Sequence, residues 1–445
     1  MKAEAKEFGK DDEFGMIIEH ELEEQNPKKP STSNDSSRIF TLLGIMRKFI
    51  GVKDLLNLRV SLPTQILDPI SNLEYWGYVD APEFFTCIPD SDDPLERMIS
   101  TVRWWIAKDL KFTKYKILKP FNSVLGEQFF CKWVVERDIE KDLLGNDVLS
   151  NGDDDSNEAT NKKMLPTKVG NVSEEDTDKP IIEYITEQVS HHPPVSAFMY
   201  RCQKKKMQAV GFDHLAAKFT GLSVTISPGT WAKGIFLTLF SRNDELYECK
   251  HSNAAISGWL TGSIKVNCIG KFVIKCKATG LAAIVEVSSK NWFGMTNDVL
   301  NGVVVSCDPI NDRIDNWSVK EAMQNGVVLA TIEGNWSKKC FVTRLSTKKK
   351  VLLVDMSSIV PTPKIVKPIE EQGEVESRRV WGDVISKMLE KDYSAATKFK
   401  TKIEEHQRKL AATRKETGEE FVPKLFAKKF DDGMPVLLPD APINL

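Results

Sequence analysis

Two adjacent histidines mark the stretch of this chain that is best suited to bind an anion. Residues Glu187–Pro194 read Glu-Gln-Val-Ser-His-His-Pro-Pro and hold two of the six histidines of the chain. Neither proline can donate to a β-ladder, so a strand that enters from Ile181 is predicted to end here. A bend at the prolines directs the imidazoles of His191 and His192 toward one opening, where each offers donors to an anion.

Two further polar stretches lie far from the histidines along the sequence. Lys119-Pro120-Phe121-Asn122 predicts a turn that presents a lysine and an amide just before a strand. Near the other end of the chain Lys400, Glu404 and Arg408 recur every four residues, which places them on one face of a predicted helix. On spacing alone, an exposed ladder of ion pairs is the favoured interpretation of that face.

Composition excludes several classes of function. The 445 residues carry a net charge of −2 with a pI near 6.4, which argues against a nucleic-acid binder. Eight cysteines without a Cys-x-x-Cys pair, and no signal peptide, indicate reduced thiols in a cytosolic protein. No apolar run is long enough to span a bilayer, so membrane contact is predicted to be peripheral.

An enzyme or a metal site is the disfavoured alternative. Adjacent histidines on one strand are poorly aimed for joint metal ligation, and no nucleophile and base stand at a suggestive spacing. We therefore expect no catalytic residue, no metal and no cofactor.

The first 180 residues hold two segments of unusual composition. Residues 1–37 are polar and charged, as is typical of a disordered leader, and residues 141–179 are predicted to form a disordered acidic insertion. Between 38 and 60 an apolar helix is predicted, which is either a core helix or a lid over a cavity. Its apolar residues are Phe40, Leu43, Ile45, Met46, Phe49 and Ile50.

The elements that position the polar stretches follow from pattern. A helix is predicted over 93–108, because an aspartate cap and a proline precede regularly spaced apolar residues. Residues 181–345 contain many short β-rich runs without intervening helical periods, which favours an antiparallel meander closed into a β-barrel. Helices follow at 376–391 and 394–417 within the region 376–417, and an irregular tail occupies 431–445.

The three polar stretches, taken in their order along the chain, resemble the blocks of the oxysterol-binding protein family. The resemblance covers roughly residues 38–430 and is closest to the short fungal members. It implies a β-rich α+β fold, in which a large incomplete antiparallel β-barrel surrounds a hydrophobic tunnel under an N-terminal lid. It implies a protein that extracts a lipid and carries it between membranes, often against phosphatidylinositol 4-phosphate.

The resemblance also assigns residues. Those expected to hold the inositol phosphate are Lys119, Asn122, His191, His192, Lys400, Glu404 and Arg408. Those expected in the lid and tunnel are the six apolar residues between 40 and 50 together with Trp76. Ser123 stands where the family usually has a second proline.

The cargo is left open between two lipids. The segment from Leu62 through Trp76 looks most like that of sterol-carrying members, so sterol is the first hypothesis and phosphatidylserine the alternative. A sensor that binds the same lipids without transporting them is a further alternative. By resemblance the protein is expected in the cytoplasm, on membranes of the endoplasmic reticulum, Golgi or plasma-membrane contacts.

Overall fold

The computed structural model describes residues 64–115, 119–136, 167–219, 223–257, 265–288, 298–308, 313–427 and 432–445. The predicted leader over 1–37 and the predicted lid over 38–60, with Phe40, Leu43, Ile45, Met46, Phe49 and Ile50, lie outside these residues. So does the part of the acidic insertion from 141 to 166.

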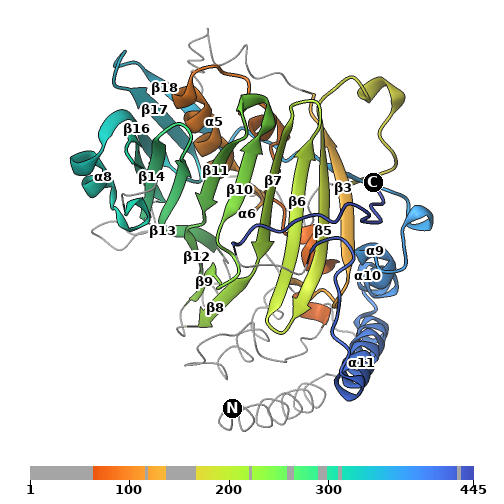
Figure 1. Cartoon of the computed structure of the whole chain (residues 1–445). Helices are drawn as coiled ribbons and strands as arrows, with labels where there is room; N and C mark the ends of the chain where they lie inside the picture. Colours follow the sequence, from red (N-terminus) through yellow and green to blue (C-terminus); the bar gives the residue numbers. More distant parts are fainter. Residues whose placement is uncertain are drawn as a thin grey trace.

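One large sheet forms the body of the molecule (Figure 1). In the described residues it has 17 strands, nearly all antiparallel, with one parallel pair between β4 and β19. The sheet curves without closing on itself, so the prediction of an incomplete antiparallel barrel in a β-rich α+β fold is confirmed. Its strands are β3 Gln128–Val134, β4 Thr167–Val169, β5 Ile181–His191, β6 Pro194–Cys202, β7 Met207–Asp213, β8 Leu215–Phe219, β9 Val224–Pro228, β10 Ile235–Leu239, β11 Glu245–Lys250, β12 Asn253–Ser257, β13 Lys265–Cys276, β14 Leu281–Ser288, β15 Val299–Ser306, β16 Val327–Asn335, β17 Lys339–Arg344, β18 Lys350–Asp355 and β19 Lys364–Val366.

Side-chain alternation sets the two faces of the sheet. Along β11, Glu245, Tyr247 and Cys249 are buried while the residues between them are partly exposed. The period of two that produces this pattern belongs to a strand with one covered face. Other strands, such as β5, are buried on both faces over most of their length, because one face packs on the core that contains α5 and the C-terminal segment covers the other.

Helices cover the ends and edges of the sheet. They are α3 Asn72–Tyr75, α4 Pro82–Thr86, α5 Pro94–Ala107, α6 Lys111–Lys114, α8 Val319–Asn325, α9 Ser377–Val380, α10 Gly382–Leu389 and α11 Tyr393–Thr417. A small parallel pair, β1 Leu67–Ser71 and β2 Lys119–Phe121, stands apart from the main sheet. In Figure 1, α5 lies near the upper end of the sheet, α8 at the upper left, and α9 to α11 at the lower right.

The predicted helix over 93–108 is confirmed as α5. The Asp93 side chain accepts a hydrogen bond from the backbone N–H of Leu95 at 2.9 Å, and Pro94 occupies the first turn, as a helix start requires. The helix buries Met98, Val102 and Trp105 in the main core. Trp104 fixes it to the preceding segment by donating its indole N–H to the carbonyl oxygen of Tyr78 at 2.9 Å.

Three predictions are wrong in part. The insertion over 141–179 contains ordered structure at its end, because Thr167–Val169 pair with β19 as strand β4. Helix α8 interrupts the predicted meander over 181–345, with Ser318 and Glu321 forming a capping box at its start. The single helix predicted over 376–391 is divided into two helices, α9 and α10. The sheet that was predicted to end at 345 continues as β18 and β19.

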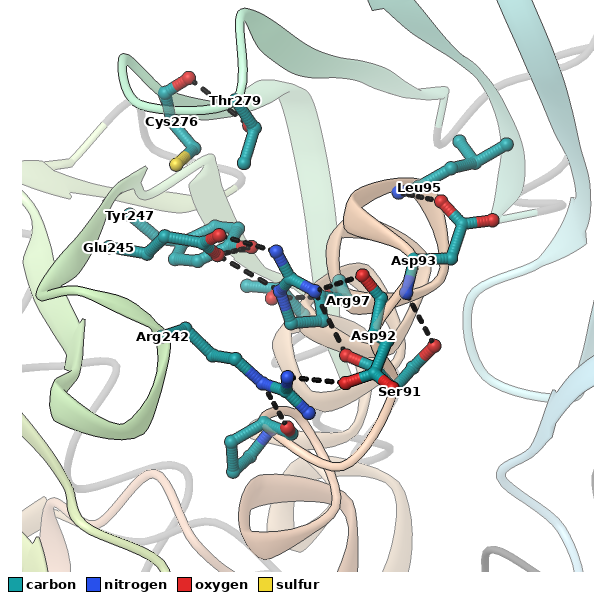
Figure 2. A network of polar contacts seen from close by, with 12 residues as sticks. Ser91, Asp92, Asp93, Leu95, Arg97, Arg242, Glu245, Tyr247, Cys276 and Thr279 are labelled. Atoms are coloured by element: carbon teal, nitrogen blue, oxygen red, sulfur yellow. Dashed lines mark hydrogen bonds and ion pairs between the residues drawn. The ribbon is translucent and has the colours of Figure 1, made fainter.

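A buried ion pair joins α5 to the sheet (Figure 2). Arg97 donates from Nε to Glu245 Oε2 at 2.9 Å and from a terminal nitrogen to the other carboxylate oxygen. Its remaining terminal nitrogen donates to the carbonyl oxygens of Ser91 and Asp92, each at 2.9 Å. Each nitrogen of the Arg97 guanidinium therefore donates to an acceptor, so the ion pair has a structural role.

Candidate functional site

The Lys119–Asn122 turn is held in one geometry by its own side chains and by stacking. Lys119 donates from Nζ to Asn122 Oδ1 at 2.6 Å and to the carbonyl oxygen of Pro120 at 3.3 Å. Phe121, which is buried, stacks on the indole of Trp381 with ring centroids 4.7 Å apart. The turn thus presents the lysine and the exposed amide of Asn122 from a fixed base.

Glu127, five residues after Asn122, ties this turn to the C-terminal helices. Its buried carboxylate accepts hydrogen bonds from Val124 N at 2.8 Å, Ser377 Oγ at 2.7 Å and Trp381 Nε1 at 3.0 Å, and also from Ser71. Burial raises the pKa of Glu127, and the four hydrogen bonds oppose that rise. Sequence analysis gave this residue no role. Its location just before a strand that is buried nearly throughout was the available signal.

The histidine stretch closes a hairpin between β5 and β6. Strand β5 ends at His191, as the prolines predict, and the His192–Pro193 peptide bond is cis. The two imidazoles lie edge to face with centroids 4.6 Å apart; His191 is half-buried and His192 exposed. Both rings are thus found at the strand end that the sequence indicates.

Backbone contacts join the histidine hairpin to the Lys119–Asn122 turn. His191 Nδ1 lies 3.2 Å from the carbonyl oxygen of Ser123. Gly126 N donates to the carbonyl oxygen of Gln188 at 2.9 Å, and Gln188 N donates to that of Glu127 at 2.8 Å. Gly126 has φ of +80°, a conformation that glycine adopts without strain. The first two polar stretches are therefore one rigid unit.

Glu187 is an anchor for the C-terminal segment. Its fully buried carboxylate accepts hydrogen bonds from the backbone N–H groups of Lys424 and Leu425 at 2.8 Å and of Phe426 at 3.3 Å. Burial raises the pKa of Glu187, and these three donors oppose that rise. The segment then crosses in front of β5 to β7, where Leu425 and Phe426 pack on the sheet (Figure 1).

Helix α11 brings the third polar stretch to the same place. Lys400 is buried and donates from Nζ to Glu404 Oε1 at 2.6 Å. The pKa of Lys119 is lowered to about 8, first by burial and then by the positive charge of Lys400, while Glu404 acts in the opposite direction. Phe121 shares an apolar cluster with Ala396, Phe399 and Ile403, which places Lys119 near Lys400 and Glu404, although about 280 residues of sequence separate them.

Packing explains why the start of α11 lies beside the turn. Asp392 caps the helix by accepting from Ala395 N at 3.0 Å, and the hydroxyls of Thr64 and Thr397 lie 3.0 Å apart. An apolar cluster beneath contains residues from all the elements that meet here: Leu67, Phe121, Val124, Trp381, Val384, Met388 and Ala396.

Arg408 and Trp76 stand apart from the gathered residues. Arg408 is exposed one turn beyond Glu404, and no side chain in the described ranges hydrogen-bonds to it. Trp76 is half-buried, with its ring centroid 5.3 Å from that of Tyr75 and 5.9 Å from that of Phe112. Both assignments, to the headgroup and to the tunnel, stay predictions.

A second polar group lies inside the curved sheet. Tyr78 donates its hydroxyl to Asp213 Oδ1 at 2.5 Å, and burial raises the pKa of Asp213 to about 6. The ammonium of Lys108 lies 4.9 Å from the ring centroid of Trp105, and the ring of His251 lies 4.8 Å from the same indole. Burial lowers the pKa of His251, which keeps the imidazole neutral. Sequence analysis found no polar group here, because the residues come from separate stretches of the chain: the segment before α4, the end of α5, β7 and the position after β11.

The gathered residues suit anion binding better than catalysis. The turn and α11 together contribute two lysines, one amide and one carboxylate, and the hairpin that contacts Ser123 adds two imidazoles, so these elements supply more N–H donors than carboxylates. Within the described ranges, no group of three or more His, Cys, Asp or Glu side chains is placed to hold a metal ion. Among the helices described, none has the length and apolar character to cross a bilayer.

Comparisons with known proteins agree on one family. The family model described as oxysterol-binding protein matches residues 41–387. An oxysterol-binding protein-like protein 1 of Schizosaccharomyces pombe is 33% identical, over 89% of this chain and 88% of its own length. Human oxysterol-binding protein-related protein 9 is 29% identical over 92% of this chain and 49% of its own length.

Solved structures share the fold at low sequence identity. The Osh1 ORD domain in complex with ergosterol has a TM-score of 0.60 and 17% identity, with 94% of this chain and 88% of that chain covered. The Osh3 ORD of Saccharomyces cerevisiae in complex with PI(4)P has a TM-score of 0.59 and 18% identity, with 89% of each chain covered.

Proposed function

We propose, from the premise that this chain belongs to the oxysterol-binding protein family, that it carries lipids between membranes by exchanging sterol for phosphatidylinositol 4-phosphate. The observation that carries the proposal is the convergence of Lys119, Lys400 and Glu404, joined through Ser123 to the histidine hairpin. No covalent step is involved: the protein binds, encloses and releases lipid.

The phosphoinositide headgroup is assigned to this cluster because of its charge and its donors. The ammonium groups of Lys119 and Lys400 supply positive charge, while the carboxylate of Glu404 orients Lys400 and accepts from an inositol hydroxyl. Asn122, His191 and His192 add further donors from the turn and the hairpin. The Osh3 ORD solved with PI(4)P shares the fold, which supports this assignment.

The cargo is assigned to the interior of the sheet. A sterol has one hydroxyl and an otherwise apolar body, so it needs a single polar contact within an apolar enclosure. Tyr78 with Asp213, and neutral His251, offer such contacts among aromatic side chains. Sterol complexes of the Osh1 ORD domain, which shares the fold, favour sterol over phosphatidylserine.

Extraction from liposomes tests the phosphoinositide half. The variants His191→Ala and His192→Ala are expected to extract phosphatidylinositol 4-phosphate less well than the parent protein while keeping their fold. Unchanged extraction by the double variant would refute the assignment. Lys205→Ala, which removes a lysine paired with Asp90 on a different part of the surface, serves as the matched control.

Mass spectrometry of co-purified lipid tests the cargo. A sterol in the purified protein supports the exchange proposed here, and phosphatidylserine identifies the alternative exchanger of the same fold. Transfer between two vesicle populations separates a carrier from a sensor, because a sensor binds lipid without moving it. The proposed location is the cytoplasm, peripherally on membranes at endoplasmic reticulum, Golgi or plasma-membrane contacts.

A further inference from the structure

The two halves of α11 differ in how they meet the rest of the molecule. The first half buries Ala396 and Lys400 and packs Tyr393, Phe399 and Ile403 against the apolar cluster beneath. In the second half every residue from 408 to 413 is exposed. In Figure 1 this end of the helix stands out from the body at the lower right.

The exposed half of α11 has no packed apolar face to stabilise it, so another interaction must do so. A helix without a packed apolar face is stabilised by ion pairs along its surface or by a partner. The exposed half offers little of the first, since its charged residues are Arg408, Lys409, Arg414 and Lys415 against Glu416 alone. The apolar surface of this half is small and consists of Leu410, Ala411 and Ala412. An apolar groove on another protein is therefore not the partner that this half fits.

Charge identifies the partner. Helix α11 contains seven lysines and arginines against three glutamates, a net of +4, in a chain whose total is −2. The rest of the chain therefore carries −6, and the helix is a local concentration of positive charge on an acidic protein. Glu419 and Glu420 follow the helix but lie beyond its Gly418 cap. A surface that attracts this helix without attracting the whole protein carries distributed negative charge, as an anionic bilayer does.

The position of the helix fixes which way the protein would face. Arg414 lies 14 residues beyond Lys400, about 21 Å along the helix axis at 1.5 Å per residue. A bilayer in contact with the exposed half is therefore within reach of the cluster formed by Lys119, Lys400 and Glu404. The same helix contributes buried residues to the headgroup site and exposed cations to its surroundings.

We propose that the exposed half of α11, from Arg408 to Thr417, docks on an anionic membrane surface and holds the headgroup site against it. Only the second part of this inference, that the headgroup site faces the membrane, rests on the proposed function. Contact is electrostatic, because the apolar surface is small, so it is reversible and weakened by salt.

Flotation of the full chain with vesicles tests this. The probe is a phosphatidylcholine vesicle with about 30% phosphatidylserine and no phosphoinositide, so the headgroup site is not engaged. Lys409→Glu combined with Lys415→Glu avoids the headgroup residues and reverses two exposed charges. Each basic residue near an anionic surface strengthens binding by about fivefold, so we expect a loss of about 25-fold or more.

The matched control makes the same charge change elsewhere. Lys348→Glu combined with Lys349→Glu alters two exposed lysines in the turn between β17 and β18, at the upper left of Figure 1. This control is expected to keep most of its vesicle binding. An equal loss in both double variants, or no loss in the helix variant, overturns the proposal.

Two further measurements distinguish loss of membrane docking from loss of headgroup binding and from coverage of the helix by protein. Binding of a soluble short-chain phosphatidylinositol 4-phosphate is expected to be unchanged in the helix variant. Unchanged binding of this ligand in headgroup variants would count against the proposed function instead, and would leave the docking of the helix to be judged by flotation. Hydrogen exchange is expected to slow over 408–417 only when anionic vesicles are added. Slow exchange there without vesicles would show that another part of this chain or a second copy covers the helix, which overturns the proposal.

Discussion

Two buried groups of charges in this protein are built in opposite ways. At the upper end of the sheet, the hydrogen bond and charge of Glu245 raise the pKa of Arg97 against the effect of burial, and each terminal group of the guanidinium meets an acceptor. At the lower right, two lysines share the single carboxylate of Glu404, and the pKa of Lys119 is lowered to about 8. Among the contacts within the described residues, the first group pairs its cation with a carboxylate, whereas the second holds two ammonium groups beside the one carboxylate of Glu404.

This difference distinguishes a structural ion pair from a binding site. A buried charge that is fully paired contributes to the fold, and removing its partner leaves an uncompensated charge. A buried charge that is only partly paired costs stability until an anion arrives. Changes to the two groups should therefore act on different quantities, which the following variants test.

The largest expected effect is on stability, at the paired group. Glu245→Ala leaves the Arg97 guanidinium buried without its carboxylate, which lowers the free energy of unfolding by about 3–5 kcal/mol. Chemical denaturation measures this change. The double variant Arg97→Met with Glu245→Met is expected to recover much of the loss. A single variant within about 1 kcal/mol of the parent protein would mean that the pair is not the structural element described.

The next effect is on binding, at the partly paired group. Lys119→Met removes one of the two ammonium groups and is expected to weaken binding of short-chain phosphatidylinositol 4-phosphate by about 2–3 kcal/mol, or roughly 30- to 150-fold. Its unfolding free energy is expected to stay level or rise, because a dehydrated charge is lost. Calorimetric titration and denaturation of the same sample give both numbers. A destabilised protein with unchanged affinity would reverse the comparison.

The lowered pKa of Lys119 predicts a pH dependence of moderate size. Phosphate prefers the protonated ammonium, so affinity is expected to fall by up to about tenfold for each unit of pH above about 8. Stability moves the other way: the unfolded chain binds more protons between that pKa and the ordinary lysine value of 10.5, so the contribution of Lys119 to stability rises with pH there. Lys119→Arg should flatten the affinity profile, since arginine stays protonated. An unchanged profile in this variant would assign the titration to another group.

The smallest effect is expected at the edge of the binding group. Arg408 is exposed, so water and salt screen its charge, and Arg408→Ala is expected to reduce headgroup affinity by less than about fivefold. The same titration measures it. A loss as large as that of Lys119→Met would show that Arg408 closes over the bound headgroup.

Sequence predicted those parts that depend on local pattern. The cap at Asp93 and the apolar spacing behind it define α5, the prolines after His192 end β5, and the four-residue spacing of Lys400, Glu404 and Arg408 lies on one helix. The resemblance to a family added the link between the three polar stretches, which spacing could not supply, since an exposed ladder has the same period.

The structural features that sequence did not predict depend on contacts between residues far apart in the chain. Arg97 and Glu245 are separated by 148 positions, so neither residue alone indicates a pair. Glu127 precedes one apolar strand and Glu187 lies in another, and the role of each carboxylate follows from donors far along the chain, Trp381 and Leu425. Strand β4 is short and sits in an acidic segment, and only pairing with β19 makes it a strand.

The clamp of Glu187 on residues 424–426 has a consequence for how the protein matures. A ribosome delivers the barrel strands before Lys400, Glu404 and the clamped segment, so the nascent chain cannot assemble its anion site until residues 400–426 have been made. Until Leu425 and Phe426 arrive, their apolar seat on β5 to β7 stays open to solvent and to chaperones. A chain that stops before residue 424 therefore exposes that apolar surface, and its Glu187 carboxylate is buried without these three backbone donors.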